Sequence, residues 1–335
     1  MSSLQSSITG KWPVVDGSGF GEPFDTFPVE ARFAVRPDLV KLAPADDWLR
    51  VDRQWPQMVA AKLAASAGDD CSLPADNIML ASACDEATEQ ARFAAVRRIC
   101  DTLAATAAGR RLGIAGTPEG VEFGAAGYRA ALTGASPLLQ PDRDDAAPVV
   151  QALGGGSDAL LLLGALAMSL QEDLVLMEQA PDGLARAALF HVSFPSAWNP
   201  SAKVGQDLLA LHAPVADNDS LQAAAPRLGQ ALLAKGPFVR WVWTVTEDPR
   251  WRAWPPQRPG ATPSPLYFRL ERQTTLPLGE GYGLFLIRVQ VRPLDDVLAV
   301  PGRLALLQAS LRSMSDDIVR YKNLGAVRSR ILSGR

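Results

Sequence analysis

The two histidines of the 335-residue chain, His191 and His212, fall within one short segment. Neutral imidazole is a common ligand of haem iron and of zinc, so either residue could hold a metal. His212 ends an amphipathic helical stretch that Pro214 must stop, and the helix dipole favours a charged histidine at such an end. His191 lies in a strand-like stretch, where a packed, hydrogen-bonded histidine is ordinary. The residues alone leave ligation by His212 and a structural role for both histidines open.

Other catalytic motifs are not found in the sequence. Cys71, Cys84 and Cys100 form no CxxC or Cys/His pattern, which argues against disulfides, a zinc site or a cysteine-bound iron–sulfur cluster. There is no GxSxG nucleophile elbow, and the Gly-rich stretches 17–22 and 154–156 lack the spacing of a phosphate loop. Serine hydrolysis and nucleotide binding are therefore disfavoured.

The composition indicates a globular protein with a substantial core. Hydrophobic residues make up 47% and charged residues 21% of the chain, and the formal net charge of -3 arises from mixed signs. We therefore expect no nucleic-acid or membrane partner. The most apolar run, Ala159 to Leu170, is too short to cross a hydrocarbon core of about 30 Å and predicts a buried helix. Because the N-terminus lacks a signal-peptide pattern, we expect a cytoplasmic protein.

The first 140 residues are predicted to be extended and then helical. A Pro- and Phe-rich segment at 23–40 precedes helical periodicity over 46–65 and 84–109. The polar segment 134–147 predicts a loop. We expect 1–140 to pack on a core formed by 141–335, in one integrated domain.

The second half predicts an α+β fold. Helical stretches at 200–211 and 220–235 separate the second and third of five strand-like segments, and 303–323 has helical spacing. The strand-like segments are 174–179, 185–195, 238–245, 266–276 and 282–291. This order predicts a five-stranded antiparallel sheet with a helical insertion over one face, the order that a PAS domain uses.

Several unusual motifs then occur in one order. Residues 194–215, "FPSAWNPSAKVGQDLLALHAPV", carry Phe-Pro-Ser, a Trp two residues on, Lys-x-Gly and Leu-His-x-Pro-Val. "WLRVD" and "LQEDLVLM" precede this segment, and "FRLERQTTLPL", "LFLIRVQVRPL" and "YKN" follow it. Together, from about 24 to 323, they resemble the haem-dependent oxidative N-demethylase alpha-subunit family.

The resemblance implies a PAS-like fold that holds haem b as a catalytic cofactor. The implied reaction is oxidative removal of a methyl group from a secondary amine such as dimethylamine, with O2 as oxidant and formaldehyde as product. Electrons would come from a separate FMN and iron–sulfur reductase, which agrees with the lack of a cysteine cluster in this chain. A tetrahydrofolate-dependent subunit that accepts formaldehyde is a further implied partner.

Such a haem would need an axial ligand and cationic partners. We expect His212 to ligate the iron, with His191, where the family usually has a small residue or cysteine, as the alternative. Two buried propionates require cations, preferably the planar guanidinium of arginine. The candidates are Lys203, Arg240, Arg269 and Arg272.

Strand alternation restricts these choices. Arg269, Glu271 and Gln273 share one face of their strand and Arg272 lies on the other, so only one of the two arginines can face a pocket. Glu271 is either an ion-pair partner of Arg269 or a catalytic residue that holds a substrate ammonium. Arg240 is the second candidate catalytic residue.

Aromatic residues and one departure from the family pattern complete the prediction. Trp198, Trp241 and Trp243 could wall the haem or contact an amine, although core packing is the simpler interpretation. Val242 stands where the family pattern has Asn, which leaves the amine substrate open. A haem-binding sensor without turnover and a haem-free small-molecule binding protein remain the alternatives.

Overall fold

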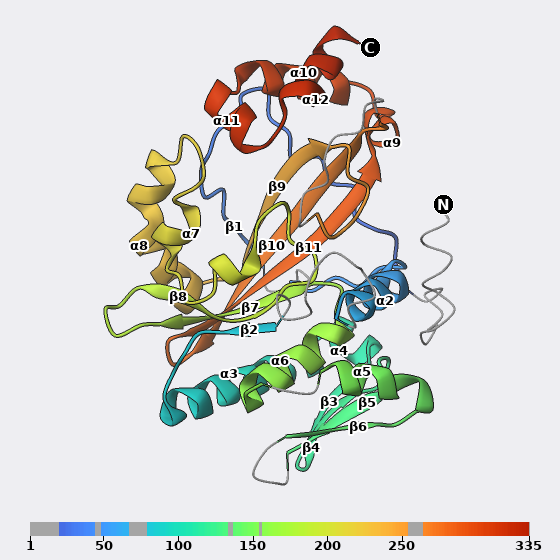
Figure 1. The fold of residues 1–335 in the computed structure, drawn as a ribbon, viewed down its shortest axis with the longest axis vertical. Coiled ribbons are helices and arrows are strands. Elements are labelled where there is room, and N and C mark those ends of the chain that lie inside the picture. Colours follow the sequence, from blue (N-terminus) through green and yellow to red (C-terminus); the bar gives the residue numbers. More distant parts are fainter. Residues whose placement is uncertain are drawn as a thin grey trace.

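A seven-stranded antiparallel sheet forms the centre of the computed structural model, which describes residues 20–43, 48–66, 79–132, 137–153, 156–253 and 264–334. The strand order is β1-β9-β10-β11-β7-β8-β2 (Figure 1). The five central strands match the five predicted segments, and they are β7 (Asp173–Gln179), β8 (Ala185–His191), β9 (Phe238–Thr246), β10 (Tyr267–Gly279) and β11 (Tyr282–Pro293). The predicted count of five is wrong, because β1 (Val40–Lys41) and β2 (Met79–Ala81) extend the two edges.

Tight turns join neighbouring central strands. Gly183 lies between β7 and β8, and Gly279 and Gly281 flank the turn between β10 and β11, with φ of 81°, 80° and 77°. Glycine adopts this left-handed region without steric cost, which explains its place at both turns. The β10–β11 ladder then runs in register from Tyr267 to Pro277. Alternate residues along it therefore share one face.

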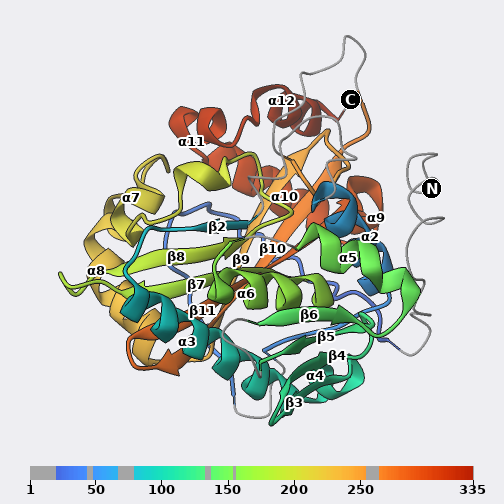
Figure 2. The ribbon, with the colours of Figure 1, turned by 60° about the horizontal axis from the view of Figure 1, so that its bottom comes forward.

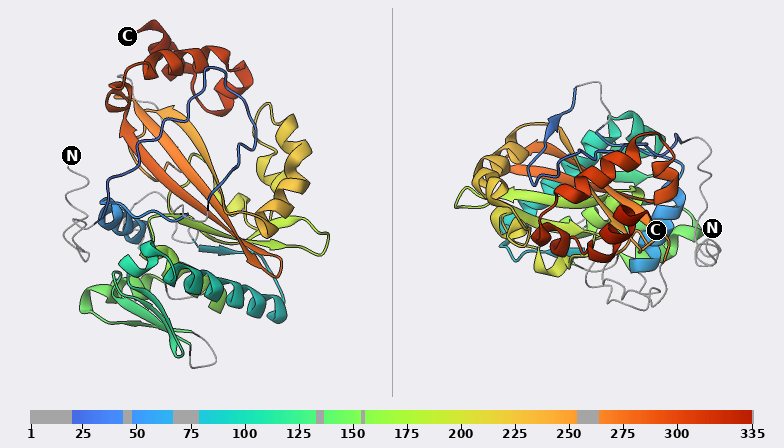
Figure 3. Two further views of the ribbon diagram at one scale, coloured as in Figure 1. Left: turned by 180° about the vertical axis from the view of Figure 1, so that it is seen from behind. Right: turned by 90° about the horizontal axis from the view of Figure 1, so that it is seen from above.

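Helices cover the sheet on both faces (Figure 3). The helices α3 (Glu86–Ala104) and α6 (Asp158–Ser169) share a hydrophobic core with β7, β8 and β11. Asp85 caps α3 by accepting the N–H of Thr88, and α6 is almost wholly buried, as its composition predicts. The inserted helices α7 (Leu208–His212) and α8 (Asp219–Ala234) pack on the other face. A short 3₁₀ turn, η4 (Pro200–Ala202), precedes them.

A second sheet was not predicted. Four short antiparallel strands follow one another in space as in sequence, next to α3 and α6 (Figure 2). They are β3 (Ile114–Thr117), β4 (Gly120–Phe123), β5 (Tyr128–Ala131) and β6 (Leu138–Pro141), flanked by α4 (Ala107–Arg111), η3 (Asp144–Ala146) and α5 (Ala147–Ala152). The expected loop at 134–147 is therefore partly wrong, because its described residues include β6 and η3. Strands of four residues give too short an alternation to be recognised in sequence.

The two ends of the described chain meet over β9 and β10. The extended segment that begins at Phe20 brings Phe27 and Val29 against Phe268, and four C-terminal helices complete this core. The predicted helix at 303–323 is interrupted at Met314, where Ser315 caps a new helix by accepting the N–H of Ile318. The helices are α9 (Leu294–Leu298), α10 (Arg303–Ser313), α11 (Asp316–Tyr321) and α12 (Gly325–Ser333). Helix α2 (Trp55–Ser66) lies against the end of α6, where Trp55 Nε1 donates to the carbonyl of Ser169. Among the described helices, none combines the length and apolarity needed to span a bilayer.

Candidate functional site

The sheet face that carries α7 and α8, here called the insertion face, gathers most of the predicted polar residues. Arg240 is the cross-strand partner of Gln273, and Val242 is that of Glu271. Directly opposed residues project to the same side of a sheet. Val242, which replaces the Asn of the family pattern, therefore lies next to the Glu271 side chain.

His212 occupies the end of α7 on this side of the sheet. Its Nδ1 lies 2.8 Å from the carbonyl oxygen of Leu208, so Nδ1 carries the proton and donates. The described residues offer no hydrogen bond to Nε2, whose lone pair is therefore free. A backbone carbonyl that holds one ring nitrogen is the usual partner of a metal-ligating histidine.

Two cations lie close to His212. Lys203 Nζ donates to the carbonyl of Leu211 at 2.8 Å, next to His212 in the chain. Burial lowers the pKa of His212, and the positive charges of Arg240 and Lys203 act in the same direction. The imidazole is therefore held in the neutral form that binds metals. The structure thus brings three of the predicted residues together.

Glu271 is 8% exposed and accepts a hydrogen bond at each carboxylate oxygen. Ser196 Oγ donates to Oε1, and Gln273 Nε2 donates to Oε2 at 2.7 Å. Arg240 Nε in turn donates to Gln273 Oε1 at 2.6 Å. Among the described residues, Glu271 makes no ion pair within 4.0 Å, and its hydrogen-bonded connection to Arg269 runs through Ser196.

Arg269 binds a loop rather than an open pocket. Its guanidinium donates to Ser196 Oγ at 2.7 Å and to the carbonyls of Phe194, Arg250 and Trp251 at 3.1, 3.0 and 2.6 Å. Most of its N–H groups are therefore already used by protein oxygens. Arg269 is a poor candidate for a propionate partner, whereas Arg240 and Lys203 retain donors that no described residue uses.

Arg272 and two tryptophans lie on the opposite face of the sheet. Arg272 Nη1 donates to the carbonyl of Trp48 at 2.9 Å, and its guanidinium lies 5.9 Å from the Trp241 ring. Trp243 stacks on Phe268 at 6.0 Å and is 7% exposed. Of the three predicted tryptophans, only Trp198 contacts the core of the insertion face.

His191 also lies on the opposite face. Its cross-strand partners are Leu174 and Met79, whose side chains pack in the core under α6. The ring is fully buried, and neither nitrogen has a hydrogen-bond partner among the described residues. Burial lowers the pKa of His191 to about 3, and the charge of Lys62 acts in the same direction. The structure therefore separates the two histidines by the sheet.

His191→Leu is expected to remove an acid-sensitive contribution to stability. With a pKa of about 3 in the folded protein, against 6.5 for an ordinary histidine, the contribution of His191 is fully present above pH 6.5. It is lost as pH falls from 6.5 towards 3, at about 1.4 kcal/mol per pH unit. At pH 8 the variant should match or exceed the wild type, because an apolar side chain replaces unpaired polar atoms.

Urea unfolding at pH 4.5, 6.5 and 8 measures this effect. The matched control is Met79→Leu, a change at the cross-strand neighbour that alters no titrating group. The assignment is wrong if His191→Leu loses as much stability as the wild type between pH 6.5 and 4.5.

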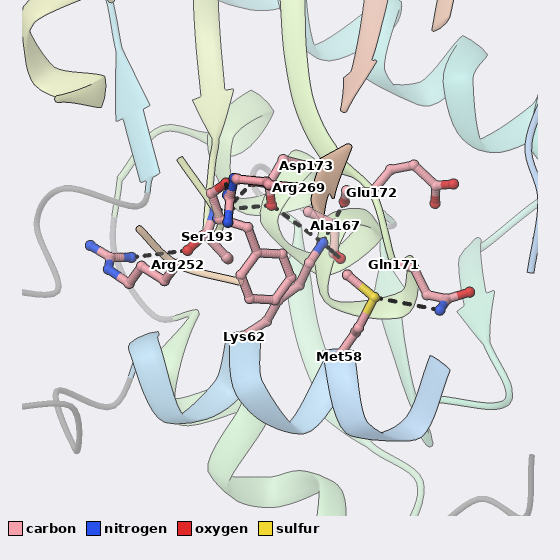
Figure 4. A network of polar contacts seen from close by, with 10 residues as sticks. Met58, Lys62, Ala167, Gln171, Glu172, Asp173, Ser193, Arg252 and Arg269 are labelled. Carbon is pink, nitrogen blue, oxygen red and sulfur yellow. Dashed lines mark hydrogen bonds and ion pairs between the residues drawn. The ribbon is translucent and has the colours of Figure 1, made fainter. Parts of the chain in front are cut away.

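A buried network fixes the loop that follows β8 (Figure 4). Asp173 accepts the backbone N–H groups of Ser193 and Phe194 at 2.9 and 2.7 Å. Lys62 Nζ lies 3.7 Å from Asp173 Oδ1 and donates to the carbonyls of Ala167 and Glu172. Burial lowers the pKa of Lys62 to about 8, so the ammonium is largely retained at neutral pH. Asp173 therefore supports the loop, whereas the buried Glu172 carboxylate has no hydrogen-bond partner among the described residues.

Sequence reasoning missed the partners of Glu271. Gln273 could be found from strand alternation, which placed it on the same face, whereas Ser196 stood in the Phe-Pro-Ser motif without an assigned role. Tyr321 and Lys322 of the "YKN" motif were likewise unassigned. Lys322 Nζ donates to the carbonyl of Trp243 at 2.9 Å, and burial lowers its pKa to about 8 against the opposing charge of Glu271.

In the described structure, neither a metal-binding cluster nor the hollow beside α2 coincides with the predicted site residues. No group of three or more His, Cys, Asp or Glu side chains there is arranged to hold a metal ion. A hollow between α2 and the small sheet is lined by Trp55, Val59, Ala126 and Tyr128, none of which was a predicted site residue.

Comparison with protein families gives a match over most of the chain. The family model described as "Haem-dependent oxidative N-demethylase, alpha subunit-like" matches residues 39–332, which is most of the chain. A search of curated proteins finds no significant match. The match includes both sheets and every polar residue of the insertion face described above.

Proposed function

Because the chain belongs to the haem-dependent oxidative N-demethylase alpha subunit-like family, we propose that it is the haem-containing subunit of an oxidative N-demethylase. The proposed substrate class is a secondary N-methyl amine such as dimethylamine. One oxygen atom of O2 ends in formaldehyde and the other in water, with two electrons from a reductase and two protons, and the primary amine is released. The observation that carries this proposal is a free, neutral imidazole on the same sheet face as a buried carboxylate.

The residues of the insertion face fit a haem. His212 would hold the haem iron through Nε2, since Nδ1 is bonded to a carbonyl and no described residue bonds to Nε2. Arg240 and Lys203 supply the cations that propionates need, and Trp198 supplies an apolar contact. Haem b, when bound, would supply the activation of O2.

The chain's own residues would bind and orient the amine. A dialkylammonium carries a positive charge and N–H donors, and the proposed acceptor is the Glu271 carboxylate, which makes no ion pair within 4.0 Å among the described residues. Val242 beside it presents an apolar surface to the alkyl groups. Binding through the ammonium would leave the methyl carbon directed away from Glu271.

We propose that the five central strands form a PAS-like core. Their spatial order is β9-β10-β11-β7-β8, and the helices are inserted between the second and third strands in sequence. On this proposal β1, β2 and the small sheet are additions. We also propose that residues 1–140 pack on the core, which residues 141–335 form.

The family name implies an enzyme of more than one subunit. The proposed partners are a reductase with FMN and an iron–sulfur cluster and a tetrahydrofolate-dependent subunit that accepts formaldehyde, in the cytoplasm. Cys84 and Cys100 are free thiols, which fits a reducing compartment.

Formaldehyde release tests the function. The haem-loaded protein, supplied with a reductase, NAD(P)H, O2 and dimethylamine, should release formaldehyde and methylamine in equal amounts. A haem-loaded protein that consumes none of several methylated amines under these conditions would instead be a haem-binding sensor or carrier.

A further inference from the structure

The two hydrogen bonds to Glu271 come from neutral groups, each of which is bonded to an arginine. Arg269 Nε donates to Ser196 Oγ at 2.7 Å, and Ser196 donates to Glu271 Oε1. Arg240 Nε donates to Gln273 Oε1 at 2.6 Å, and Gln273 Nε2 donates to Glu271 Oε2 at 2.7 Å. Each carboxylate oxygen is thus bonded to a neutral group that is itself bonded to a guanidinium.

This arrangement fixes the direction of both hydrogen bonds to Glu271. Arginine has donors and no acceptor, so it occupies the oxygen of the serine hydroxyl and of the glutamine amide. The O–H of Ser196 and the N–H of Gln273 are then left to point at Glu271. Because neither arginine pairs directly with Glu271, the negative charge is oriented without being neutralised by a bidentate partner.

The loop that carries Ser196 is held by its backbone. Asp173 accepts the N–H of Phe194 at 2.7 Å, and Arg269 donates to the carbonyl of the same residue at 3.1 Å. The N–H of Ala253 donates to the carbonyl of Pro195 at 3.1 Å. Ala197, directly after Ser196, has φ of 61°, a region that alanine rarely adopts. Strained backbone of this kind persists where surrounding contacts determine it, often at functional sites.

We propose that Ser196 and Gln273 are positioning residues that present the Glu271 carboxylate to the ammonium of the substrate. Arg269 and Arg240 orient these two residues from behind. Each Glu271 oxygen then keeps a second acceptor position for an N–H of the amine. This inference rests on the proposed function, because it assigns residues that act on the amine through Glu271.

A double-mutant cycle on amine binding tests this positioning role. Calorimetric titration with dimethylammonium chloride is carried out on the haem-loaded wild type, Ser196→Ala, Glu271→Gln and the double variant. Ser196→Ala should raise the Kd about 10-fold, as expected for loss of one hydrogen bond to a charged group. In the Glu271→Gln background the same substitution should change the Kd less than about 2-fold, because Ser196 acts through Glu271.

Further variants guard against a general structural effect. Ser196→Thr keeps the hydroxyl and should bind the amine within about 3-fold of the wild type, and Gln273→Met should repeat the loss from the other side. The control is Thr244→Val, at the cross-strand partner of Arg269, whose buried hydroxyl has no hydrogen-bond partner among the described residues. It should bind as the wild type.

Two results would overturn the inference while the proposed function stands. One is wild-type affinity in both Ser196→Ala and Gln273→Met, and the other is an equal loss from Ser196→Ala with and without Glu271. A wild type that binds no dimethylammonium would overturn the proposed amine site and the inference together, and it is recognised from the wild-type titration alone.

Discussion

Arg288→Met is expected to lower the free energy of unfolding by about 3 to 5 kcal/mol. Arg288 Nη2 lies 2.5 Å from Asp52 Oδ2, and the two side chains are 1% and 5% exposed. The other Asp52 oxygen accepts hydrogen bonds from the N–H of Gln54 and from Gln171 Nε2. Removing the guanidinium leaves a buried carboxylate without its counter-charge, at the start of α2.

Urea unfolding of apoprotein variants measures this loss. Arg292→Met is the matched control on the same strand, since Arg292 pairs with Asp25 at 2.6 Å but the side chains are 33% and 51% exposed. This control should lose no more than about 1 kcal/mol. Asp52→Asn combined with Arg288→Met should recover part of the loss, because no unpaired charge then remains. Equal losses of unfolding free energy in Arg288→Met and Arg292→Met would contradict the conclusion that burial makes the Arg288–Asp52 pair important for stability.

Glu271→Gln is expected to weaken dimethylammonium binding about 100-fold. The substitution keeps the size and the position of the side chain but removes the charge that an ammonium needs, worth about 3 kcal/mol for a desolvated pair. Formaldehyde release at low amine concentration should fall by at least the same factor. The measurement is the Kd for the amine and the rate of formaldehyde release in the haem-loaded protein.

The control for this effect is Glu247→Gln. Glu247 follows β9 directly and pairs with Arg330 at 2.5 Å, so the same charge is removed at a place away from Glu271. Binding and turnover should be within about 2-fold of the wild type. An amine affinity that is unchanged in Glu271→Gln would show that another group holds the ammonium.

The features that were predicted correctly are those that depend on the pattern of neighbouring residues. Alternation along β10 correctly placed Glu271 and Gln273 together and Arg272 on the other face, because side chains in a strand alternate strictly. Pro214 correctly predicted the end of the helix at His212. The small sheet was missed because its strands have four residues each, which is too short a window for periodicity.

Contacts between distant segments could not be predicted. Asp52 and Arg288 are 236 residues apart, and Ser196 and Glu271 are 75 apart. Each stands in a motif of the family pattern, but no local rule says which motif meets which. His191 illustrates the same limit. Only its cross-strand partners show that its side chain points into the core, on the opposite face of the sheet from His212.

The visible spectrum of the purified protein tests the central claim, that His212 binds a haem iron. Spectra of the ferric and dithionite-reduced forms are compared for the wild type, His212→Ala and His191→Ala, all expressed with adequate haem. We expect a Soret band in the wild type and in His191→Ala, and its loss or shift in His212→Ala. A change confined to His191→Ala would contradict the assigned ligand, and a haem-replete wild type without a Soret band would contradict the haem site itself.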